Sequence, residues 1–425
     1  MTRSARFLLS LLQVAVLLLA FAAPTLARDP EPLPPLLEYF MKSIETQVNE
    51  NKTKLLPAVG RIEKTDTGYV AEEVVLAVVI EDRTVPLVRI ARIAVDHPAE
   101  EDGLLTAKHM RFNDFRLEIT DFTKQDSETP LFSLIMPEVI LDDVSVLKAE
   151  AARNVMEKVN ADNLMAGSVV IPTLELTLND SKRLLVTGIR GGFKGDRRTG
   201  AGHSEIELGR VELPAEVVSM LSRKDALGGL GFARFIFTGG VVLDTGWDEK
   251  ERMYINAALR AGMEGAGDLN ISLTDLRIPA QVLLEAQGPG SDERIDEAIE
   301  NANSPLGRML REEITLRGLA IGWTDKGLTE KLIAFSMKKN GLTKDQIIEA
   351  WSAYPQSFLF VLGLPQVGMQ AGQALKEFLQ NPESLVISME AKAPMNFSTL
   401  MTLLEDPQGL TESLNLKVIA NGGGK

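Results

Sequence analysis

From about Leu56 to Ile278 the sequence alternates between apolar and polar residues, and this period of two constrains the fold most. The clearest runs are Phe115–Thr120 and Thr173–Leu178, in which every second residue is apolar. Successive side chains of a β-strand point to opposite faces, so such strands have one apolar and one polar face, as in antiparallel sheets. The sequence therefore predicts an α+β protein whose main element is a long, twisted, mainly antiparallel β-sheet.

Two stretches of this region are nearly the same. Gly200–Val218 reads GAGHSEIELGRVELPAEVV and Gly265–Leu283 reads GAGDLNISLTDLRIPAQVL, with identical residues at 8 of 19 positions. Each stretch has a glycine turn, two pairs of alternating apolar residues with a two-residue gap between the pairs, and then Pro-Ala. A two-residue gap shifts the phase of the pleat, as a β-bulge does. We therefore predict a duplicated strand–bulge–strand–helix unit, irregular near Gly209 and near Thr274-Asp275.

The same spacing of four apolar residues recurs elsewhere in the chain. It is found with polar gaps from Met110 to Leu117 and more loosely from Val139 to Val146 and from Ile314 to Ile321. Spacing alone is a weak signal, because a chain with this apolar content gives such matches by chance. The sheet is nevertheless expected to consist of divergent strand–bulge–helix repeats.

Helices are predicted at the start of the chain and in its last quarter. Pro35 to about Lys54 places Leu36, Phe40, Ile44 and Val48 on one helical face. Shorter helices are expected at residues 151–163, 215–222 and 293–301, and C-terminal ones at 326–339, after Thr343, at 365–380 and at 398–404. With strands at 385–389 and 414–418, these elements indicate a β-rich region over residues 28–324 and a helical C-terminal region with two added strands over residues 325–425.

Three local signals support the C-terminal helices. Asp325 has the character of a helix N-cap, Asn340-Gly341 that of a helix stop, and Thr343 with Gln346 has capping-box spacing.

The N-terminus has the features of a secretory signal peptide. Arg3 and Arg6 precede an apolar run from Phe7 to Ala23, and Thr25-Leu26-Ala27 offers a small-residue cleavage site. We expect residues 1–27 to be removed; an uncleaved inner-membrane anchor is the alternative, since the run is near the minimum length that spans a bilayer. The chain has no cysteine, which excludes disulfides and thiolate chemistry. An exported chain of this size without disulfides indicates a periplasmic protein of a bacterial envelope.

The charge of the chain argues against nucleic-acid binding. The net charge is −14 and becomes two units more negative without the segment 1–27, so the surface repels polyphosphates. One local exception is the glycine-rich stretch that contains Arg190, Lys194, Arg197 and Arg198. This stretch is predicted to be a basic hairpin tip. It is either a solvated loop or a contact for an anionic partner, such as a membrane surface or an envelope protein.

Motifs for catalysis are weak. Adjacent residues of a strand point to opposite faces, so His203-Ser204 is a poor nucleophile–base pair. Asp142-Asp143 lacks further ligands at metal-binding spacing, and the sequence contains neither G-x-S-x-G nor H-E-x-x-H. We therefore expect a non-enzymatic protein with no catalytic, metal-binding or cofactor-binding residues. A hydrolase that uses two scattered carboxylates stays open as an alternative.

The repeated strands also carry a family resemblance. The GAG turns with IELGRVEL and ISLTDLRI, behind an export segment, resemble the AsmA-like and YdgA-like families of Gram-negative envelope proteins. The segment LRGLAIGWTDKGLTEKLIAFSMKKNGLT is similar to uncharacterised exported proteobacterial proteins. The resemblance extends over Leu104–Leu342 in the pattern of the repeats, not residue by residue. It implies long sheets of divergent repeats and a role in lipid handling or envelope maintenance. It places no site residue.

These observations favour a protein that binds or transfers a hydrophobic ligand, a lipid above all. A sheet with one apolar face and few helices leaves part of that face open, and an open apolar groove is a binding site by default. The alternative is a structural or assembly factor of the cell envelope whose core is filled and which has no ligand. The residues predicted to line the groove are Ile206, Leu208, Ile271, Leu273, Phe358 and Phe360.

Overall fold

A computed structural model describes residues 33–48, 55–80, 83–120, 130–178, 182–214, 234–287, 290–361, 363–406 and 413–422, with residues 230, 232 and 409. The predicted signal peptide and the helix expected at 215–222 lie outside these residues. The chain divides into two compact units, here called unit 1 (Met1–Val217 and Leu283–Arg294) and unit 2 (Val218–Val282 and Ile295–Lys425). The predicted boundary near residue 325 falls inside unit 2.

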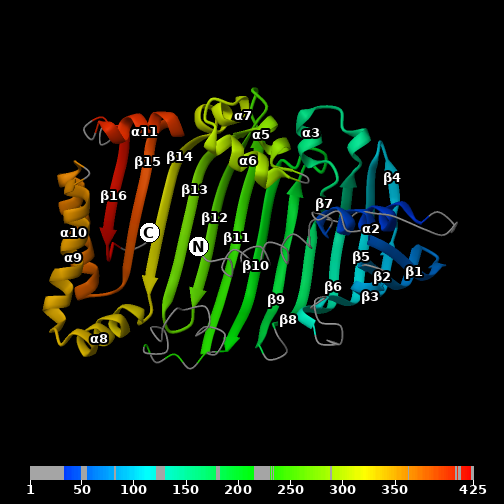
Figure 1. Cartoon of the computed structure of the whole chain (residues 1–425), viewed down its shortest axis with the longest axis horizontal. Coiled ribbons are helices and arrows are strands. Elements are labelled where there is room, and N and C mark those ends of the chain that lie inside the picture. The colour runs from blue at the N-terminus through cyan, green and yellow to red at the C-terminus, as the bar shows by residue number, and fades with distance from the viewer. Residues whose placement is uncertain are drawn as a thin grey trace. The chain divides into compact units, whose positions relative to one another are not determined.

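The fold is α+β, as predicted. Most of the described chain forms long antiparallel strands, and helices are more frequent toward the C-terminal half (Figure 1).

Unit 1 is one antiparallel sheet with a helix across it. The helix, α2 (Pro35–Val48), begins at the proline where the sequence predicts it to begin. The sheet order is β1-β2-β3-β5-β6-β8-β9-β10, with the short strands β4 paired to β5 and β7 paired to β6. The strands are β1 (Leu55–Lys64), β2 (Gly68–Ile80), β3 (Arg83–Asp96), β4 (Ala99–Glu101), β5 (Leu104–Thr120), β6 (Pro130–Leu147), β7 (Leu164–Met165), β8 (Ser168–Leu178), β9 (Lys182–Gly195) and β10 (Gly202–Pro214). Between β6 and β7 lie a single 3-10 turn (Ala149–Ala151) and the short helix α3 (Val155–Asn160).

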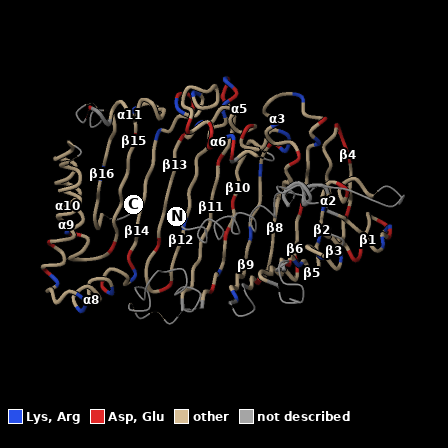
Figure 2. Tube along the Cα trace, in the orientation of Figure 1, with Lys and Arg blue, Asp and Glu red and all other residues tan. Residues whose placement is uncertain are grey.

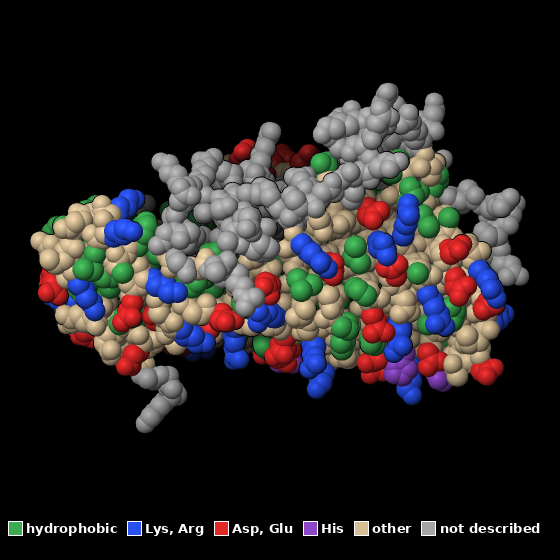
Figure 3. All heavy atoms as spheres, turned by 90° about the horizontal axis from the view of Figure 1, so that it is seen from below, with side chains coloured by type: hydrophobic (Ala, Val, Ile, Leu, Met, Phe, Trp, Pro, Cys, Tyr) green, Lys and Arg blue, Asp and Glu red, His purple; other side chains and the backbone are tan. Residues whose placement is uncertain are grey.

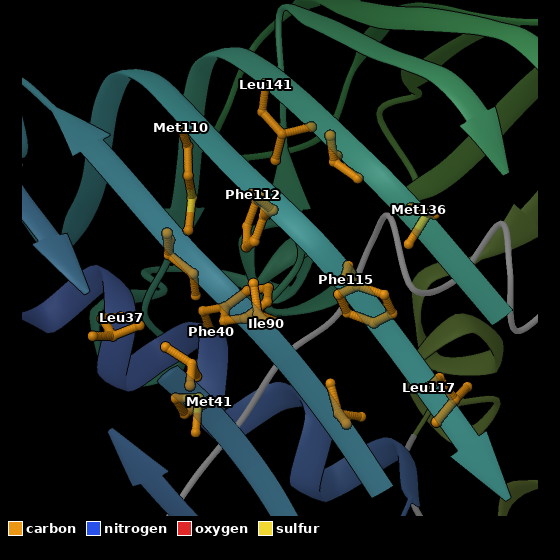
Figure 4. Packing of buried hydrophobic residues seen from close by; sticks show 14 of the residues in the cluster. Leu37, Phe40, Met41, Ile90, Met110, Phe112, Phe115, Leu117, Met136 and Leu141 are labelled. Carbon is orange, nitrogen blue, oxygen red and sulfur yellow. The ribbon is translucent and has the colours of Figure 1, made fainter. Parts of the chain in front are cut away.

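The apolar face of this sheet is filled by α2. Leu37, Phe40 and Met41 of the helix are buried in one continuous core with side chains from β2, β3, β5 and β6. Figure 4 shows Phe40 beside Phe112 of β5, and the centroids of the two rings are 4.8 Å apart. Burying large aromatic and aliphatic side chains in this way stabilises the unit by the hydrophobic effect. Beneath α2, unit 1 therefore has a packed core, and a cavity of about 680 Å³ lies between the start of the helix and residues of β1, β2 and β5.

The predicted phase shifts are present in unit 1, and single residues in the left-handed region produce them. Asp114 has a φ of +52°, and it separates Phe112 from Phe115, which are both buried although they are three residues apart. Glu73 of β2 and Asp143 of β6 have similar φ values, +53° and +49°. The pairing of β5 with β3 and β6 keeps the same register on both sides of Asp114. Neighbouring strands thus change phase together, so the shift occurs without an extra residue.

The strands of unit 2 are antiparallel and follow one another in the order β11-β12-β13-β14-β15-β16. Its strands are β11 (Arg234–Trp247), β12 (Arg252–Met263), β13 (Gly267–Pro279), β14 (Thr315–Asp325), β15 (Ser384–Asn396) and β16 (Leu414–Ala420). Its helices are α7 (Pro305–Arg308), a π-helical turn (Met309–Glu313), α8 (Leu328–Asn340), α9 (Lys344–Val361), α10 (Pro365–Gln380) and α11 (Phe397–Glu405). Two more helices, α5 (Ala280–Glu285) and α6 (Ser291–Glu300), contain residues of both units.

The two copies of the duplicated stretch differ in how they shift phase. In the second copy, β13 contains a true bulge: its register with β12 shifts between Ile255 and Ala257. Asp275 at the bulge has a φ of +52°, and its backbone N–H donates to Asn256 Oδ1 at 2.8 Å. In the first copy, β10 stays in register with β9, and the left-handed residue is Gly188 of β9, opposite Gly209. The expectation of a bulge with an extra residue is therefore correct at Asp275 but wrong at Gly209.

The predicted C-terminal helix signals are confirmed, except that the N-cap residue of α8 is Gly327 and Asp325 caps the helix from two positions before it. Asp325 accepts hydrogen bonds from the N–H of Gly327 and from the N–H and hydroxyl of Thr329 at the start of α8. Gly341 ends α8 with a φ of +68°. Thr343 and Gln346 form the reciprocal hydrogen bonds of a capping box, at 2.9 and 3.3 Å.

Candidate ligand-binding site

One face of the sheet in unit 2 is apolar from strand to strand. Residues at the same level of adjacent strands share a face, and the pairing of β12 to β16 aligns three apolar rows on this face. The first row is Leu259–Ile271–Ile321–Ile387–Val418, the second Ala257–Leu273–Leu319–Met389–Leu416 and the third Ala261–Leu269–Trp323–Leu385–Ala420. We call these three rows the apolar face of unit 2. The opposite face is more polar, with Arg260, Asn270 and Lys417 among its residues.

The first row of the apolar face is open. Leu259 and Ile321 are each 39% exposed and Ile387 is 50% exposed, whereas the core side chains under α2 in unit 1 are fully buried. Isolated exposed aliphatic residues are normal, but a contiguous row of them on a sheet marks a ligand or partner site. The exposed row therefore sets this part of unit 2 apart from the filled core of unit 1.

A helical hairpin covers the end of the apolar face at β15 and β16. Helices α9 and α10 run antiparallel to each other, and α10 packs on β16 (Figure 1). Leu359, Leu364 and Val367 of the hairpin cluster with Met389 and Leu416 of the second row. A second cluster joins the other end of the hairpin to the third row; its members include Ile347, Phe378, Trp323 and Leu385.

The two helices of the hairpin approach each other closely at two glycines. A Cβ atom at Gly368 would lie 3.1 Å from the backbone oxygen of Gln356, and one at Gly372 would lie 2.4 Å from the Gln356 side chain. The spacing of four residues puts both glycines on the same face of α10. This close fit gives the hairpin a defined position over the strands.

A cavity of about 400 Å³ lies between the hairpin and the apolar face. Its walls are apolar side chains of α9, α10, β15 and β16, among them Phe358, Leu359, Ala371, Ile387 and Val418. Pro355 of α9 also lines it; proline has no N–H, so the helix lacks one backbone hydrogen bond beside the cavity. Ile387 is both part of the cavity wall and part of the open row. The cavity is therefore continuous with the exposed part of the face, and its size is within the range of small-ligand sites.

A comparison with known proteins finds a match for part of the chain. A family model described as an uncharacterized protein matches residues 260–421. That span contains β13 to β16 and the α9–α10 hairpin, and so most of the apolar face. No curated protein and no solved structure matches the chain. The comparison names no activity and does not connect the chain to the AsmA-like proteins, so that resemblance stays a prediction.

The predicted groove residues fall into three groups. Ile271 and Leu273 are on the apolar face of unit 2, both half-buried, and Phe358 lines the cavity. Ile206 and Leu208 belong to unit 1, where Leu208 packs against the core under α2. Phe360 is 70% exposed.

Sequence reasoning missed the most exposed row. Leu259 and Ile321 alternate with polar or small residues in their own strands, which was the available signal, whereas Ile387 follows Val386 and has no such signal.

The basic hairpin between β9 and β10 has a structural role at two of its four cations. Arg198 donates from Nε to Glu157 Oε1 at 2.9 Å and from Nη2 to Glu157 Oε2 at 3.0 Å. It also donates to the carbonyl oxygens of Asp102 at 3.1 Å and Ala151 at 2.9 Å. Arg197 lies over the ring of Phe193, and burial lowers the pKa of its guanidinium. Arg198 is thus an internal anchor, and its prediction as an anionic-partner contact is wrong.

The other two cations, Arg190 and Lys194, are exposed. They border a shallow hollow of about 330 Å³ that also contains Glu205 and Glu207, and Arg190 pairs in register with Glu207. Lys and Arg side chains are interspersed with Asp and Glu over the described surface in Figure 3. The mixture of charges weakens the hollow as an anion site, because each acidic side chain offsets a basic one.

The histidines and carboxylates outside the hairpin form pairs. Nδ1 of His109 lies 2.7 Å from Asp142 Oδ1, and Nδ1 of His97 lies 3.1 Å from Asp96 Oδ2. Both histidine side chains are more than half exposed. Within the described part of the chain, no three His, Asp or Glu residues are grouped as a metal site requires. His203 and Ser204 both lie in the strand β10, where adjacent side chains point to opposite faces, as the sequence predicts.

Proposed function

We propose that the chain is a non-enzymatic periplasmic envelope protein that binds or transfers a hydrophobic ligand, a lipid. One observation carries the proposal: the open row Leu259, Ile321 and Ile387 leads into an apolar cavity beneath the α9–α10 hairpin. Water in contact with such a surface is unfavourable, and a ligand that replaces it gains about 0.8 kcal/mol per buried methylene group.

The chemistry of the cavity favours an acyl chain over a polar molecule. Its described walls are aliphatic and aromatic, and Ser388 and Lys417, which also border it, occupy positions of the opposite face of β15 and β16. A polar ligand left without hydrogen-bond partners in such a site would lose several kcal/mol. A hydrocarbon chain needs no partners and can continue from the cavity along the open row.

The alternative function is that of a structural or assembly factor without a ligand, and unit 1 supports it. The core beneath α2 is filled, with Leu37, Met110 and Ile93 almost completely buried. In this alternative the apolar face of unit 2 would contact another envelope protein. The two functions differ in what purified protein carries, so one experiment separates them.

The experiment is lipid extraction and mass spectrometry on purified protein, with two matched variants. Ile387→Asp puts a carboxylate into the cavity wall. Ile419→Asp is the control, because Ile419 is 46% exposed, close to the 50% of Ile387, and lies on the opposite face of the neighbouring strand. We expect wild type and Ile419→Asp to carry lipid and Ile387→Asp to carry at least tenfold less, since a charged group is costly against hydrocarbon.

Thermal unfolding of each variant controls for loss of structure. A wild-type protein free of lipid would contradict the proposal and leave the scaffold function. Equal loss of lipid from the two folded variants would also contradict it.

The periplasmic location has its own test. The signal peptide predicted at residues 1–27 implies a mature N-terminus at Arg28 in the periplasmic fraction, which N-terminal sequencing would detect. Among the described residues, no helix has the length and apolar character needed to span a bilayer. Recovery from membranes with Met1 or Thr2 at the N-terminus would instead favour the anchor.

A further inference from the structure

The halves of α9 and α10 on either side of the turn between them expose large apolar side chains. Val361 is 83% exposed, Tyr354 73% and Phe360 70%, and Phe358 and Met369 are also more than half exposed. We call these five residues the apolar tip. Tyr354, Phe358 and Val361 are spaced four and three residues apart, so they share one face of α9. The same face begins at Ile347 and Trp351, which pack in the core of unit 2. These three residues are therefore the outer end of a stripe whose inner end is buried, whereas Phe360 lies on another face of α9 and Met369 on α10.

The apolar tip lies in a long stretch of sequence that contains no charged residue. From Ala350 to Leu375 the chain contains no Asp, Glu, Lys or Arg, although 24% of all residues are charged. Figure 2 shows the described parts of α9 and α10 near the turn without charged residues, whereas the opposite ends of these helices carry them. Helix α11, whose Leu400 and Leu403 join the cluster around Leu359, is also uncharged up to Leu404 and exposes Phe397 and Met401.

We propose that the apolar tip inserts into the surface of a lipid bilayer. Tyrosine and tryptophan are enriched at the boundary between headgroups and acyl chains, and phenylalanine and leucine are common on the side of interfacial helices that enters the bilayer. The net charge of −14 repels anionic membranes elsewhere on the protein. An uncharged tip reduces that repulsion where the contact is made. Charge thus favours a membrane over an acidic or basic protein partner, which would need complementary charges at the contact.

The position of the tip connects it to the cavity. Phe358 belongs both to the apolar tip and to the cavity wall, and Leu364 at the start of α10 lines the cavity from the other side of the turn. A tip inserted at a bilayer would therefore hold the cavity within one side-chain layer of the acyl chains. This consequence rests on the proposed lipid-binding function, whereas the insertion itself does not.

The test is flotation of the purified mature protein with lipid vesicles. Vesicles of phosphatidylcholine alone and of phosphatidylcholine with one quarter phosphatidylglycerol are compared. We expect binding to both, weaker on the anionic vesicles, and at least tenfold weaker binding of Phe360→Asp. The matched control is Ile299→Asp on α6, because Ile299 is an apolar residue with a similar exposed fraction, 66%, outside the tip. Neither Phe360 nor Ile299 lines the cavity.

Three outcomes would overturn the proposal. The first is wild type that does not float with either vesicle. The second is Phe360→Asp that floats as well as wild type. The third is a wild-type dimer that Phe360→Asp converts to a monomer in analytical ultracentrifugation, which would assign the tip to self-association. Lipid carriage is measured separately: Phe360→Asp that still carries lipid but does not float would uphold both proposals, and protein that floats without carrying lipid would leave only the insertion.

Discussion

Replacing Arg198 should destabilise unit 1 strongly, although the residue lies in a hairpin whose sequence resembles a solvated loop. The Arg198 side chain is 17% exposed and that of its partner Glu157 is 7% exposed, and the two share a bidentate contact. Arg198→Ala leaves a buried carboxylate without its cation, which typically costs 3–5 kcal/mol. Two further donations, to the carbonyls of Asp102 and Ala151, are lost as well. We expect a decrease of about 3 kcal/mol in the free energy of unfolding.

The assay is urea denaturation followed by far-UV circular dichroism. A decrease of this size moves the urea midpoint by about 1 M or more. All three tryptophans, Trp247, Trp323 and Trp351, are in unit 2, so their emission reports on the other unit. The control is Arg190→Ala in the same hairpin, where an exposed cation is worth at most about 1 kcal/mol. A midpoint for Arg198→Ala within error of the control would refute the assignment of Arg198 as an anchor.

The same ion pair predicts a pH dependence. The hydrogen bonds from Arg198 hold the pKa of Glu157 below its ordinary value of 4.5, despite the opposing effect of burial. Because the folded-state pKa is lower than the unfolded-state value, the stabilisation is complete above the unfolded-state pKa and is lost as the pH falls through the folded-state pKa. The difference in stability between wild type and Glu157→Gln should therefore shrink on acidification. A difference that is constant from neutral to acid pH would contradict this.

Substitutions at two further positions test the fold. Asp114 has a left-handed backbone, so Asp114→Gly should leave the free energy of unfolding almost unchanged, whereas Asp114→Val should lower it by about 1–2 kcal/mol. Equal urea midpoints for the two variants would contradict the phase-shift interpretation. Phe40→Ala removes the side chain that joins α2 to Phe112 and should lower the free energy of unfolding by about 3–5 kcal/mol in the same assay; a loss below about 1 kcal/mol would mean that α2 does not fill the core.

The sequence predicted those features of the fold that depend on residues close together in the chain. The strands, the bulge at Asp275 and the caps at Asp325 and Gly341 depend on residues close together in the chain, and their signals are the period of two, a two-residue gap and single capping residues. The phase shift of β10 was assigned to the wrong strand, because the left-handed residue is Gly188 on its neighbour. The apolar pattern of one strand does not show which residue of the paired strand has a left-handed backbone.

The site was less predictable, because it depends on contacts between distant segments. Arg198 has the sequence context of a flexible loop, and its partner Glu157 is 41 residues away. Ile271 and Leu273 could be assigned to an apolar face, but their exposure depends on how far α9 and α10 extend over the strands. Phe358 and Phe360 are two residues apart on one helix, yet only Phe358 lines the cavity.

The most direct test of the lipid-binding proposal is photo-crosslinking with a diazirine-bearing palmitic acid, followed by mapping of the labelled residues. The proposal predicts labels on the open row and the cavity wall, at Ile321, Ile387 and Phe358, and competition by unlabelled palmitic acid. Labels confined to the strands beneath α2, or labelling that unlabelled palmitic acid does not reduce, would contradict it.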